Sequence, residues 1–488
     1  MDVLLVNPEY NGKSEIPPLG LECIAAVLLK NGMNVSIIDL DVHPSLHVYD
    51  YLLTQLQADK PEIVGVTSMS NSFESAQKVC RTVKEVDPDI LTVMGGIHAT
   101  VLSDSILEKH KDVDAIVRGE GEISFLEVTR NFLRNMPFGN IEGISFRNSG
   151  NVVHNRDRKL TRDLDSFPLP AHDLVKNEDY ETRSISSSRG CFHNCSFCSI
   201  QSLCHKIVRT RSISNIIDEI ESLIDCGAKR IMFTDDNFTF SPKRVRHLCS
   251  EIIQRKLHEK VVFYAEGRID DICRTPVMAQ ILSDAGFRGL YVGAESGSEE
   301  ILDYYRKEIT PDDIYKGVSY CVEQNLTPVV NFILYGPRDT IETMRQTISL
   351  AKKLYENGAE IAYAEALTPY PGTPIKEQLE RDGKFREFQG IYYFESYEGL
   401  GIDRILQLCN AARDITHLMH KDDPFFEIKK IYFELGYLDE LLCGKVPYEF
   451  KRHSISNREG GGAWEKIHQN TINLIPESCT KSSTDEHT

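Results

Sequence analysis

Short apolar runs alternate with amphipathic stretches over the first 150 residues of the chain. Five of the runs have the length of buried strands, at residues 3–6, 35–39, 63–67, 91–94 and 115–117. Between them, stretches such as residues 21–29 and 72–86 repeat their apolar side chains at helical spacing. Strands that alternate with helices indicate a parallel sheet covered by helices on both faces. Five strands in about 120 residues predict a flavodoxin-like doubly wound domain.

The same alternation returns at residue 184. The candidate strands there are residues 184–188, 230–234, 261–265, 289–293, 328–334 and 360–364. The helix before the second strand is well marked, because apolar residues recur at helical spacing from Ile213 to Ile224 and Gly227 follows as a stop signal. Six strands are too few for a closed eight-stranded barrel, so we expect an open, partial (β/α)₆ barrel of the TIM type.

These patterns divide the chain into four segments. They are an α/β domain, a polar linker that contains Pro168 and Pro170, the partial barrel, and a helical C-terminal region, at residues 1–150, 151–183, 184–394 and 395–488. Helical patterns at residues 402–416 and 427–442 support the last assignment. The final residues have the composition of a disordered tail.

Composition and charge restrict the partners of the chain. Of its 488 residues, 41% are hydrophobic and 26% charged, as in ordinary globular proteins, and the net charge is −18. This acidic balance argues against binding to nucleic acid or to anionic membranes, since both need clustered Lys and Arg. No apolar run approaches the ~18 residues of a membrane span, and the N-terminus lacks the basic region of a signal peptide. We therefore expect a cytoplasmic protein whose partner is a small molecule.

Three of the thirteen cysteines lie close together, as Cys191, Cys195 and Cys198. A [4Fe–4S] cluster normally takes four thiolates, so three would leave one iron open to a small molecule. The alternative is structural zinc, which takes four protein ligands. Its fourth ligand could come from Cys204, His193 or His205, but no second cysteine knuckle lies nearby. The tight spacing disfavours three unrelated cysteines, and we expect the other ten to be small core residues.

The cysteine spacing, its place after the first barrel strand and the aromatic residue before Cys198 resemble the radical S-adenosylmethionine (SAM) superfamily. The resemblance extends over residues 184–375. It implies that the three cysteines hold a [4Fe–4S] cluster whose open iron binds the amino and carboxylate groups of SAM. Reductive cleavage then yields methionine and a 5′-deoxyadenosyl radical, with electrons from a reducing partner such as flavodoxin or ferredoxin.

By the same resemblance, polar residues after the later barrel strands contact SAM. They are Asp235, Asp236, Asn237, Glu266, Arg268, Glu295 and Tyr370. Asp235 or Asp236 can accept hydrogen bonds from the SAM ammonium group, and Arg268 can bind a carboxylate through its fork of donors. Glu295 can accept from ribose hydroxyls. Barrel proteins gather their chemistry at these strand ends, although each residue could instead cap a helix or pair with a surface cation.

Small and polar residues also follow the strands of the first domain. They are Ser68, Ser70, Gly95, Gly96, His98, Gly119, Glu120 and Gly121. No G-x-G-x-x-G motif follows the first strand, so a nicotinamide-binding domain is not expected. These turns and residues 17–20 resemble the cobalamin-binding domain that one branch of the radical SAM superfamily carries. The resemblance implies that the residues of these turns contact cobalamin.

One histidine motif mimics a known cobalt ligand. Corrinoid carriers that replace the lower axial base use Asp-x-His-x-x-Gly after the first strand, and residues 41–43 match only its beginning. They follow the second strand and lack the glycine, so we interpret His43 as an ordinary loop residue. His98 could pack near the corrin or bond to backbone, and we expect cobalamin to bind without histidine on cobalt.

The resemblance as a whole implies a cobalamin-dependent radical SAM enzyme. The expected activity is methylation of an unactivated carbon of a small metabolite through methylcobalamin and the 5′-deoxyadenosyl radical. A radical dehydratase, dehydrogenase or cyclase on the same scaffold is the main alternative. A non-enzymatic corrinoid carrier or sensor is a second alternative, which the cysteine spacing disfavours.

Overall fold

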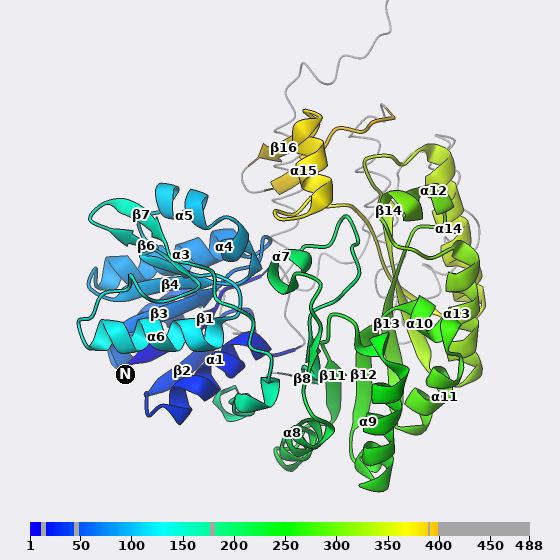
Figure 1. Ribbon diagram of the computed structural model, residues 1–488, viewed down its shortest axis with the longest axis horizontal. Coiled ribbons are helices and arrows are strands. Elements are labelled where there is room, and N and C mark those ends of the chain that lie inside the picture. Colours follow the sequence, from blue (N-terminus) through cyan, green and yellow to red (C-terminus); the bar gives the residue numbers. More distant parts are fainter. Residues whose placement is uncertain (11–15, 43–47, 176–179, 181, 389–390, 399–488) are drawn as a thin grey trace, which may run out of the picture.

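The computed structural model describes residues 1–10, 16–42, 48–175, 180, 182–388 and 391–398. These residues form two α/β units that lie next to each other (Figure 1). The first carries a seven-stranded sheet and the second a six-stranded sheet. The helical C-terminal region expected beyond residue 398 lies outside the described residues. In the part that is described, no helix is long and apolar enough to cross a membrane.

The first sheet has the strand order β2-β1-β3-β4-β5-β6-β7. Its strands are β1 (Val3–Asn7), β2 (Val35–Asp39), β3 (Ile63–Thr67), β4 (Leu91–Gly95), β5 (Ala115–Val117), β6 (Ile144–Asn148) and β7 (Asn151–His154). The five predicted strands pair in parallel in the flavodoxin-like order, which confirms the expected fold. Strands β6 and β7 add an antiparallel hairpin, so the sheet extends four residues into the predicted linker.

Alternation of side chains explains why both faces of this sheet are covered. Val3 and Leu5 of β1 belong to one hydrophobic core, whereas Leu4 and Val6 belong to another. The first core includes residues of α1 (Leu19–Lys30) and α6 (Gly121–Leu133), and the second includes residues of α2 (Val48–Asp59), α3 (Phe73–Val86) and α5 (Ser103–Lys109). The short α4 (Ile97–Val101) follows β4.

The second sheet is an open barrel of six parallel strands. Its order β15-β14-β13-β12-β11-β8 runs through β8 (Thr182–Ile185), β11 (Arg230–Phe233), β12 (Val262–Gly267), β13 (Phe287–Glu295), β14 (Thr327–Tyr335) and β15 (Glu360–Ala366). Its helices include α8 (Ile213–Asp225), α9 (Pro242–Gln254), α10 (Ile269–Arg274), α11 (Val277–Asp284), α12 (Glu299–Tyr304), α13 (Pro311–Glu323) and α14 (Ile341–Glu356). All six predicted strands are present, and one hydrophobic core joins them to the helices.

Smaller elements complete the second unit. They are a ribbon of β9 (Ser188–Arg189) and β10 (Arg209–Thr210), helices α7 (Gln201–Cys204) and α15 (Pro374–Arg381), and a hairpin of β16 (Phe385–Phe388) and β17 (Ile391–Phe394). The sequence predicted neither the ribbon nor the hairpin. Strands of two to four residues carry too few positions to show a period of two.

A buried histidine of the linker joins the two units. His172 is hydrogen-bonded through Nδ1 to Glu22 of α1 (2.8 Å) and through Nε2 to Glu219 of α8 (2.9 Å). Arg183 also binds Glu22, and Arg211 pairs with Glu219. Burial opposes the charge on His172, but the hydrogen bonds from both carboxylates outweigh it and raise the pKa of the ring to about 9. The protonated ring therefore donates to one carboxylate of each unit.

Replacing this histidine should destabilise the protein in a pH-dependent way. A pKa raised from 6.5 to about 9 corresponds to about 3 kcal/mol of folding free energy. That contribution is complete below pH ~6.5 and is lost as the pH rises through ~9. We expect His172→Gln to lower the free energy of unfolding most near pH 6.5 and least above pH 9, measured by thermal unfolding across this range. The exposed His247→Gln is the matched control, and a loss for His172→Gln that stays constant with pH would contradict the assignment.

Candidate active site

The cysteine loop begins where the chain leaves the ribbon strand β9. Gly190 has a φ of +94°, and a Cβ at this position would lie 2.1 Å from the carbonyl oxygen of Ile207, so only glycine fits. Gln201 of α7 donates to the carbonyl oxygens of Cys191 and His193 and fixes the loop from its far side. Glycine and glutamine thus give residues 191–198 one conformation without regular secondary structure.

The three cysteines of this loop are free and lie near one another. Burial is the largest influence on Cys191 and Cys198 and raises the pKa of both thiols, that of Cys198 to about 11. The neighbouring thiols, Cys195 among them, raise these pKa values further. Thiolates crowded in this way need positive charge to stay ionised, and iron supplies it. The loop therefore fits the predicted [4Fe–4S] cluster.

The zinc alternative requires ligands that converge on a single ion. Among the described residues, no group of three or more Cys, His, Asp or Glu is arranged to hold one metal ion. Cys204 lies beside the loop, but its thiol donates to the carbonyl oxygen of Cys191. His193 is buried, and its Nδ1 lies 3.9 Å from Glu308.

Only one of the three polar residues after β11 leaves its side chain exposed. Asp235 is 1% exposed and accepts hydrogen bonds from the backbone N–H of Ser187 (3.0 Å) and from the hydroxyls of Ser187 and Ser188. Asn237 is also buried and donates to Asp271. These two side chains stabilise the loops themselves. Asp236 is exposed, and it accepts from the backbone N–H of Gly190 (2.6 Å), directly before the first cysteine.

Glu266 at the end of β12 joins Asp236 in an acidic group near the cysteine loop. Its carboxylate is exposed, but the surrounding protein and the negative charges of Asp236 and Asp235 raise its pKa to about 7. The surrounding protein and the charge of Asp235 likewise raise the pKa of Asp236. Acidic groups that repel one another gain from a bound cation, and the ammonium group of SAM has the charge that fits.

Arg268 lies against a cluster cysteine. It is 6% exposed, and its guanidinium contacts the thiol of Cys195 (Nη1 to Sγ, 3.7 Å), the carboxylate of Asp270 (2.9 Å) and the carbonyl oxygen of Lys307 (2.6 Å). Five donors on one planar group make these contacts compatible. Within the described residues one of its donors therefore reaches the cysteine loop, where a hydrogen bond to sulfur tunes an iron–sulfur cluster, and the others bind Asp270 and Lys307.

Glu295 is the last residue of β13, and Tyr370 lies in the loop after β15. Glu295 has a φ of +65° at a register shift between β13 and β14, is 8% exposed, and pairs with Lys307 at 2.6 Å. Tyr370 accepts from the hydroxyl of Thr373 in a turn that contains Gly372. A Cβ on Gly372 would lie 3.0 Å from Val101 of α4. The loop after β15 therefore contacts the first unit next to its predicted cobalamin site.

The predicted cobalamin residues after β3 and β4 come together. Gly96 has a φ of +93°, and a Cβ there would lie 2.4 Å from the carbonyl oxygen of Ser68. The hydroxyl of Ser68 is buried and has no hydrogen-bond partner among the described residues. His98 shares a hydrogen bond with Ser70 (3.0 Å) and packs on Phe73, with ring centroids 4.4 Å apart. An orphaned hydroxyl and a tight glycine turn at strand ends fit a polar group of a cofactor.

His98 is neutral in this environment. It is 3% exposed, and burial lowers its pKa to about 4. The structure places it at the start of α4, among the residues predicted to contact cobalamin. His43, the other histidine of the cobalamin argument, lies outside the described residues.

The glycine turn after β5 contacts both α4 of its own unit and the second unit. Gly95 lies beside β5, and the backbone N–H of Gly119 donates to Thr100 of α4, which links this turn to the Gly96 turn. Gly121 begins α6, where a Cβ would lie 2.8 Å from Ile24. The carboxylate of Glu120 instead binds Arg189 and Arg209 of the second unit. No motif in the sequence points to Arg209, whereas Arg189 stands two residues before Cys191.

Comparison with known proteins identifies both units. Residues 11–129 match the B12 binding domain, and residues 185–351 match the radical SAM superfamily. The chain is also 31% identical over 367 residues to an uncharacterised methyltransferase of Pyrococcus horikoshii, an alignment that covers 74% of this chain and 78% of that protein. The chain belongs to the cobalamin-dependent branch of the radical SAM superfamily. Its cofactors are a [4Fe–4S] cluster, SAM and cobalamin, as expected from the sequence.

Other relatives catalyse different reactions. The anaerobic magnesium-protoporphyrin IX monomethyl ester cyclase of Cereibacter sphaeroides is 28% identical over 78% of this chain, which spans 64% of that protein. The hopanoid C-3 methylase of Methylococcus capsulatus is 25% identical over 77% of this chain and 71% of its own. The family therefore includes methyl transfer and ring formation.

Two solved structures share the fold. The cobalamin-dependent SAM radical enzyme OxsB superposes with a TM-score of 0.75 at 16% identity and covers 91% of this chain and 72% of its own. The radical SAM methyltransferase TsrM of Kitasatospora setae has a TM-score of 0.67 at 21% identity over 79% of this chain and 77% of its own. At these identities the two superpositions show that the fold is shared.

The close approach of Gly96 to the backbone of Ser68 can be tested by substitution. We expect Gly96→Ala to lower the free energy of unfolding by about 3 kcal/mol, because its Cβ adds a clash with Ser68 to the cost of a positive φ. Gly32→Ala is the matched control, since Gly32 has a similar φ of +76° with open space around it and should cost only about 1 kcal/mol. Chemical denaturation measures both, and equal losses would show that Gly96 makes no close contact.

Proposed function

We propose that this radical SAM enzyme is a C-methyltransferase that acts on a small metabolite. The observation that carries the proposal is the contact between the two cofactor regions: the turn at Gly119–Gly121 binds the ribbon that leads into the cysteine loop. Similarity to methyltransferases supports it. When bound, the cluster and SAM supply a 5′-deoxyadenosyl radical, and cobalamin supplies the methyl group.

The residues of the chain position these groups. Cys191, Cys195 and Cys198 would hold the cluster, and Arg268 would donate to the sulfur of Cys195. Asp236 and Glu266 would receive the ammonium group of SAM, since their charges lie near each other and remain exposed. Asp235, Asn237, Glu295 and Tyr370 support the surrounding loops in this proposal.

The cobalamin region has its own requirements. Ser68 offers a buried hydroxyl, and Gly96 allows the backbone to approach closely. His98 is neutral and is held by Ser70, so we assign it to packing and not to cobalt. Like other radical SAM enzymes, the protein takes electrons from a separate reductant, and we propose a flavodoxin or ferredoxin.

Ring formation without methyl transfer is the second candidate. Its support is the 28% identity to the magnesium-protoporphyrin ester cyclase. The two candidates share SAM cleavage and differ in whether cobalamin receives and passes on a methyl group.

Anaerobic reconstitution with iron, sulfide and hydroxocobalamin separates these possibilities. We expect about four irons per chain, retained corrinoid, and formation of both 5′-deoxyadenosine and S-adenosylhomocysteine from SAM under reducing conditions. The variant with Cys191, Cys195 and Cys198 all changed to Ala should lose iron and 5′-deoxyadenosine. The control is Cys226→Ala, at an exposed position outside the loop. Cleavage of SAM without retained corrinoid or S-adenosylhomocysteine would exclude methylation and favour the cyclase.

A further inference from the structure

The two strands of the short antiparallel ribbon, β9 and β10, precede and follow the cysteine loop along the chain. Arg189 on β9 stands directly opposite Arg209 on β10, so the ribbon presents two guanidinium groups side by side. Only Gly190 separates Arg189 from Cys191. Any movement of this ribbon relative to the first unit therefore carries the whole cysteine loop with it and changes the distance of that loop from the first unit.

One carboxylate of the first unit binds both arginines. Arg209 donates to Glu120 in a bidentate arrangement, with Nη1 to Oε2 at 2.8 Å and Nη2 to Oε1 at 2.7 Å. Arg189 donates to the same Oε1 at 3.2 Å. Arg209 also donates to the carbonyl oxygen of Thr161 in the linker at 2.9 Å and is 7% exposed. Bidentate geometry fixes direction as well as distance.

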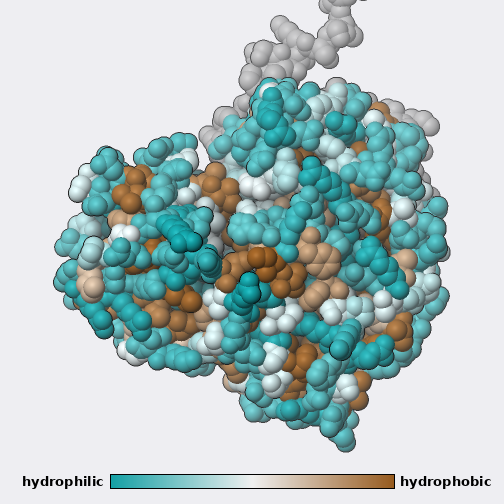
Figure 2. Space-filling view, viewed as in Figure 1, coloured by the Kyte–Doolittle hydropathy of each residue, from teal (hydrophilic) through white to brown (hydrophobic). Residues whose placement is uncertain are grey.

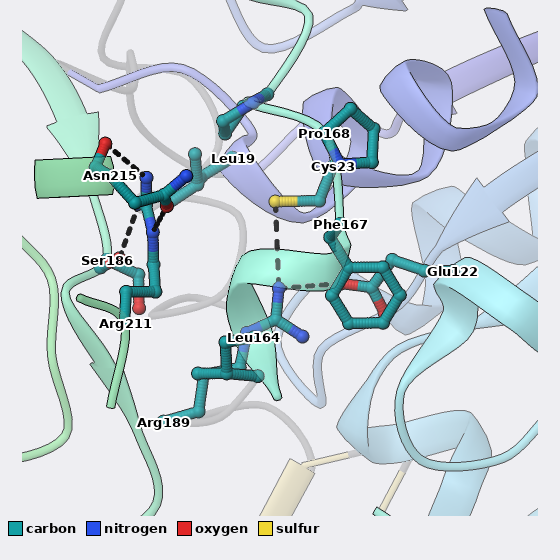
Figure 3. Close-up of a pocket in the computed structure, with 11 residues that line it drawn as sticks. Leu19, Cys23, Glu122, Leu164, Phe167, Pro168, Ser186, Arg189, Arg211 and Asn215 are labelled. Atoms are coloured by element: carbon teal, nitrogen blue, oxygen red, sulfur yellow. Dashed lines mark hydrogen bonds and ion pairs between the residues drawn. The ribbon is translucent and has the colours of Figure 1, made fainter. Parts of the chain in front are cut away.

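A second carboxylate completes the set of charges. Arg189 pairs with Glu122 at 2.6 Å, reaches the thiol of Cys23 at 3.8 Å and stacks near Phe167 of the linker. Figure 3 shows the guanidinium of Arg189 between Cys23 and Glu122. These residues line a cavity of about 30 Å³. Burial would raise the pKa of Glu120, but the hydrogen bonds and charges of the two arginines outweigh it and lower that pKa. Two arginines and two glutamates balance in charge.

These four charged residues lie between the two predicted cofactor regions. Glu120 and Glu122 flank the start of α6, directly after the predicted cobalamin turn, and the ribbon leads into the predicted cluster loop. Figure 2 shows apolar side chains gathered near the middle of this face, where the two units adjoin. The bidentate pair of Arg209 and Glu120 holds one register between the units.

We propose that Glu120, Glu122, Arg189 and Arg209 are positioning residues that set the separation between the cluster and cobalamin. This inference rests on the proposed function, because it concerns methyl transfer from SAM bound in one unit to cobalamin bound in the other. Cleavage of SAM to 5′-deoxyadenosine needs only the second unit. We call these four residues the clamp. Loosening the clamp should therefore reduce methyl transfer to cobalamin and leave the cleavage of SAM to 5′-deoxyadenosine intact.

The test compares both products in a single reconstituted sample. SAM is supplied with reduced cobalamin, which takes the methyl group with the electron pair of cobalt(I) and leaves S-adenosylhomocysteine. For Arg209→Gln we expect at least a tenfold loss of S-adenosylhomocysteine formation and less than a twofold change in 5′-deoxyadenosine. Arg209→Lys keeps the charge and should recover part of the lost rate.

The matched control breaks an exposed ion pair that involves none of these four residues. Arg255→Gln removes the exposed contact between Arg255 and Glu221 and should change neither product. Hydrogen exchange of the apo chain gives a second readout. Backbone amides of β9 and β10 should exchange faster in Arg209→Gln and not in Arg255→Gln.

The outcomes are distinguishable. A wild-type protein that forms no S-adenosylhomocysteine refutes the proposed function, and hydrogen exchange then still tests the clamp. A wild-type protein that forms it, with an Arg209→Gln variant that gives the same product ratio, overturns the positioning role. If Arg209→Gln does not fold, the ratio measured for Arg209→Lys decides, and an unchanged ratio overturns the proposal.

Discussion

Carboxylates of the first unit, paired with cations of the linker and barrel, hold the two sheets in one orientation. Glu22 binds His172 and Arg183, and Glu120 binds Arg189 and Arg209. Desolvation offsets part of the attraction within such pairs. Separating the units would leave a buried charge without its partner, which costs several kcal/mol. The pairs therefore select an orientation as well as adding stability.

That orientation matters because each cofactor region belongs to a different unit. Parallel strands collect small and polar residues at their carboxyl ends, so both sheets carry a binding edge. The Gly372 turn on Val101 and the Glu120 contacts bring these edges together. The chemistry of the family needs SAM, cluster and cobalamin within reach of one substrate. The linker and the ribbon, which hold no cofactor in our proposal, create that proximity.

The sequence predicted the elements well where the pattern was long. Eleven predicted strands were found, five in the first sheet and six in the barrel, because strands buried on both faces form continuous apolar runs. The hairpins β6–β7 and β16–β17 and the ribbon were missed, because they are short and partly polar. The linker was predicted as polar sequence, but its His172 proved to be a buried partner of both units.

Local sequence determined which residues could serve the site: three cysteines at fixed spacing, glycine turns after strands, and acidic residues at strand ends. Spacing along the chain fixes these groups relative to their own loop. Only the tertiary structure decided which side chains remain available. Asp235 and Asp236 are neighbours in sequence, yet one is buried under serines and the other is exposed beside the cysteine loop. The partners of Glu120 come from residues 69 and 89 positions away, and no local pattern encodes contacts made across that distance.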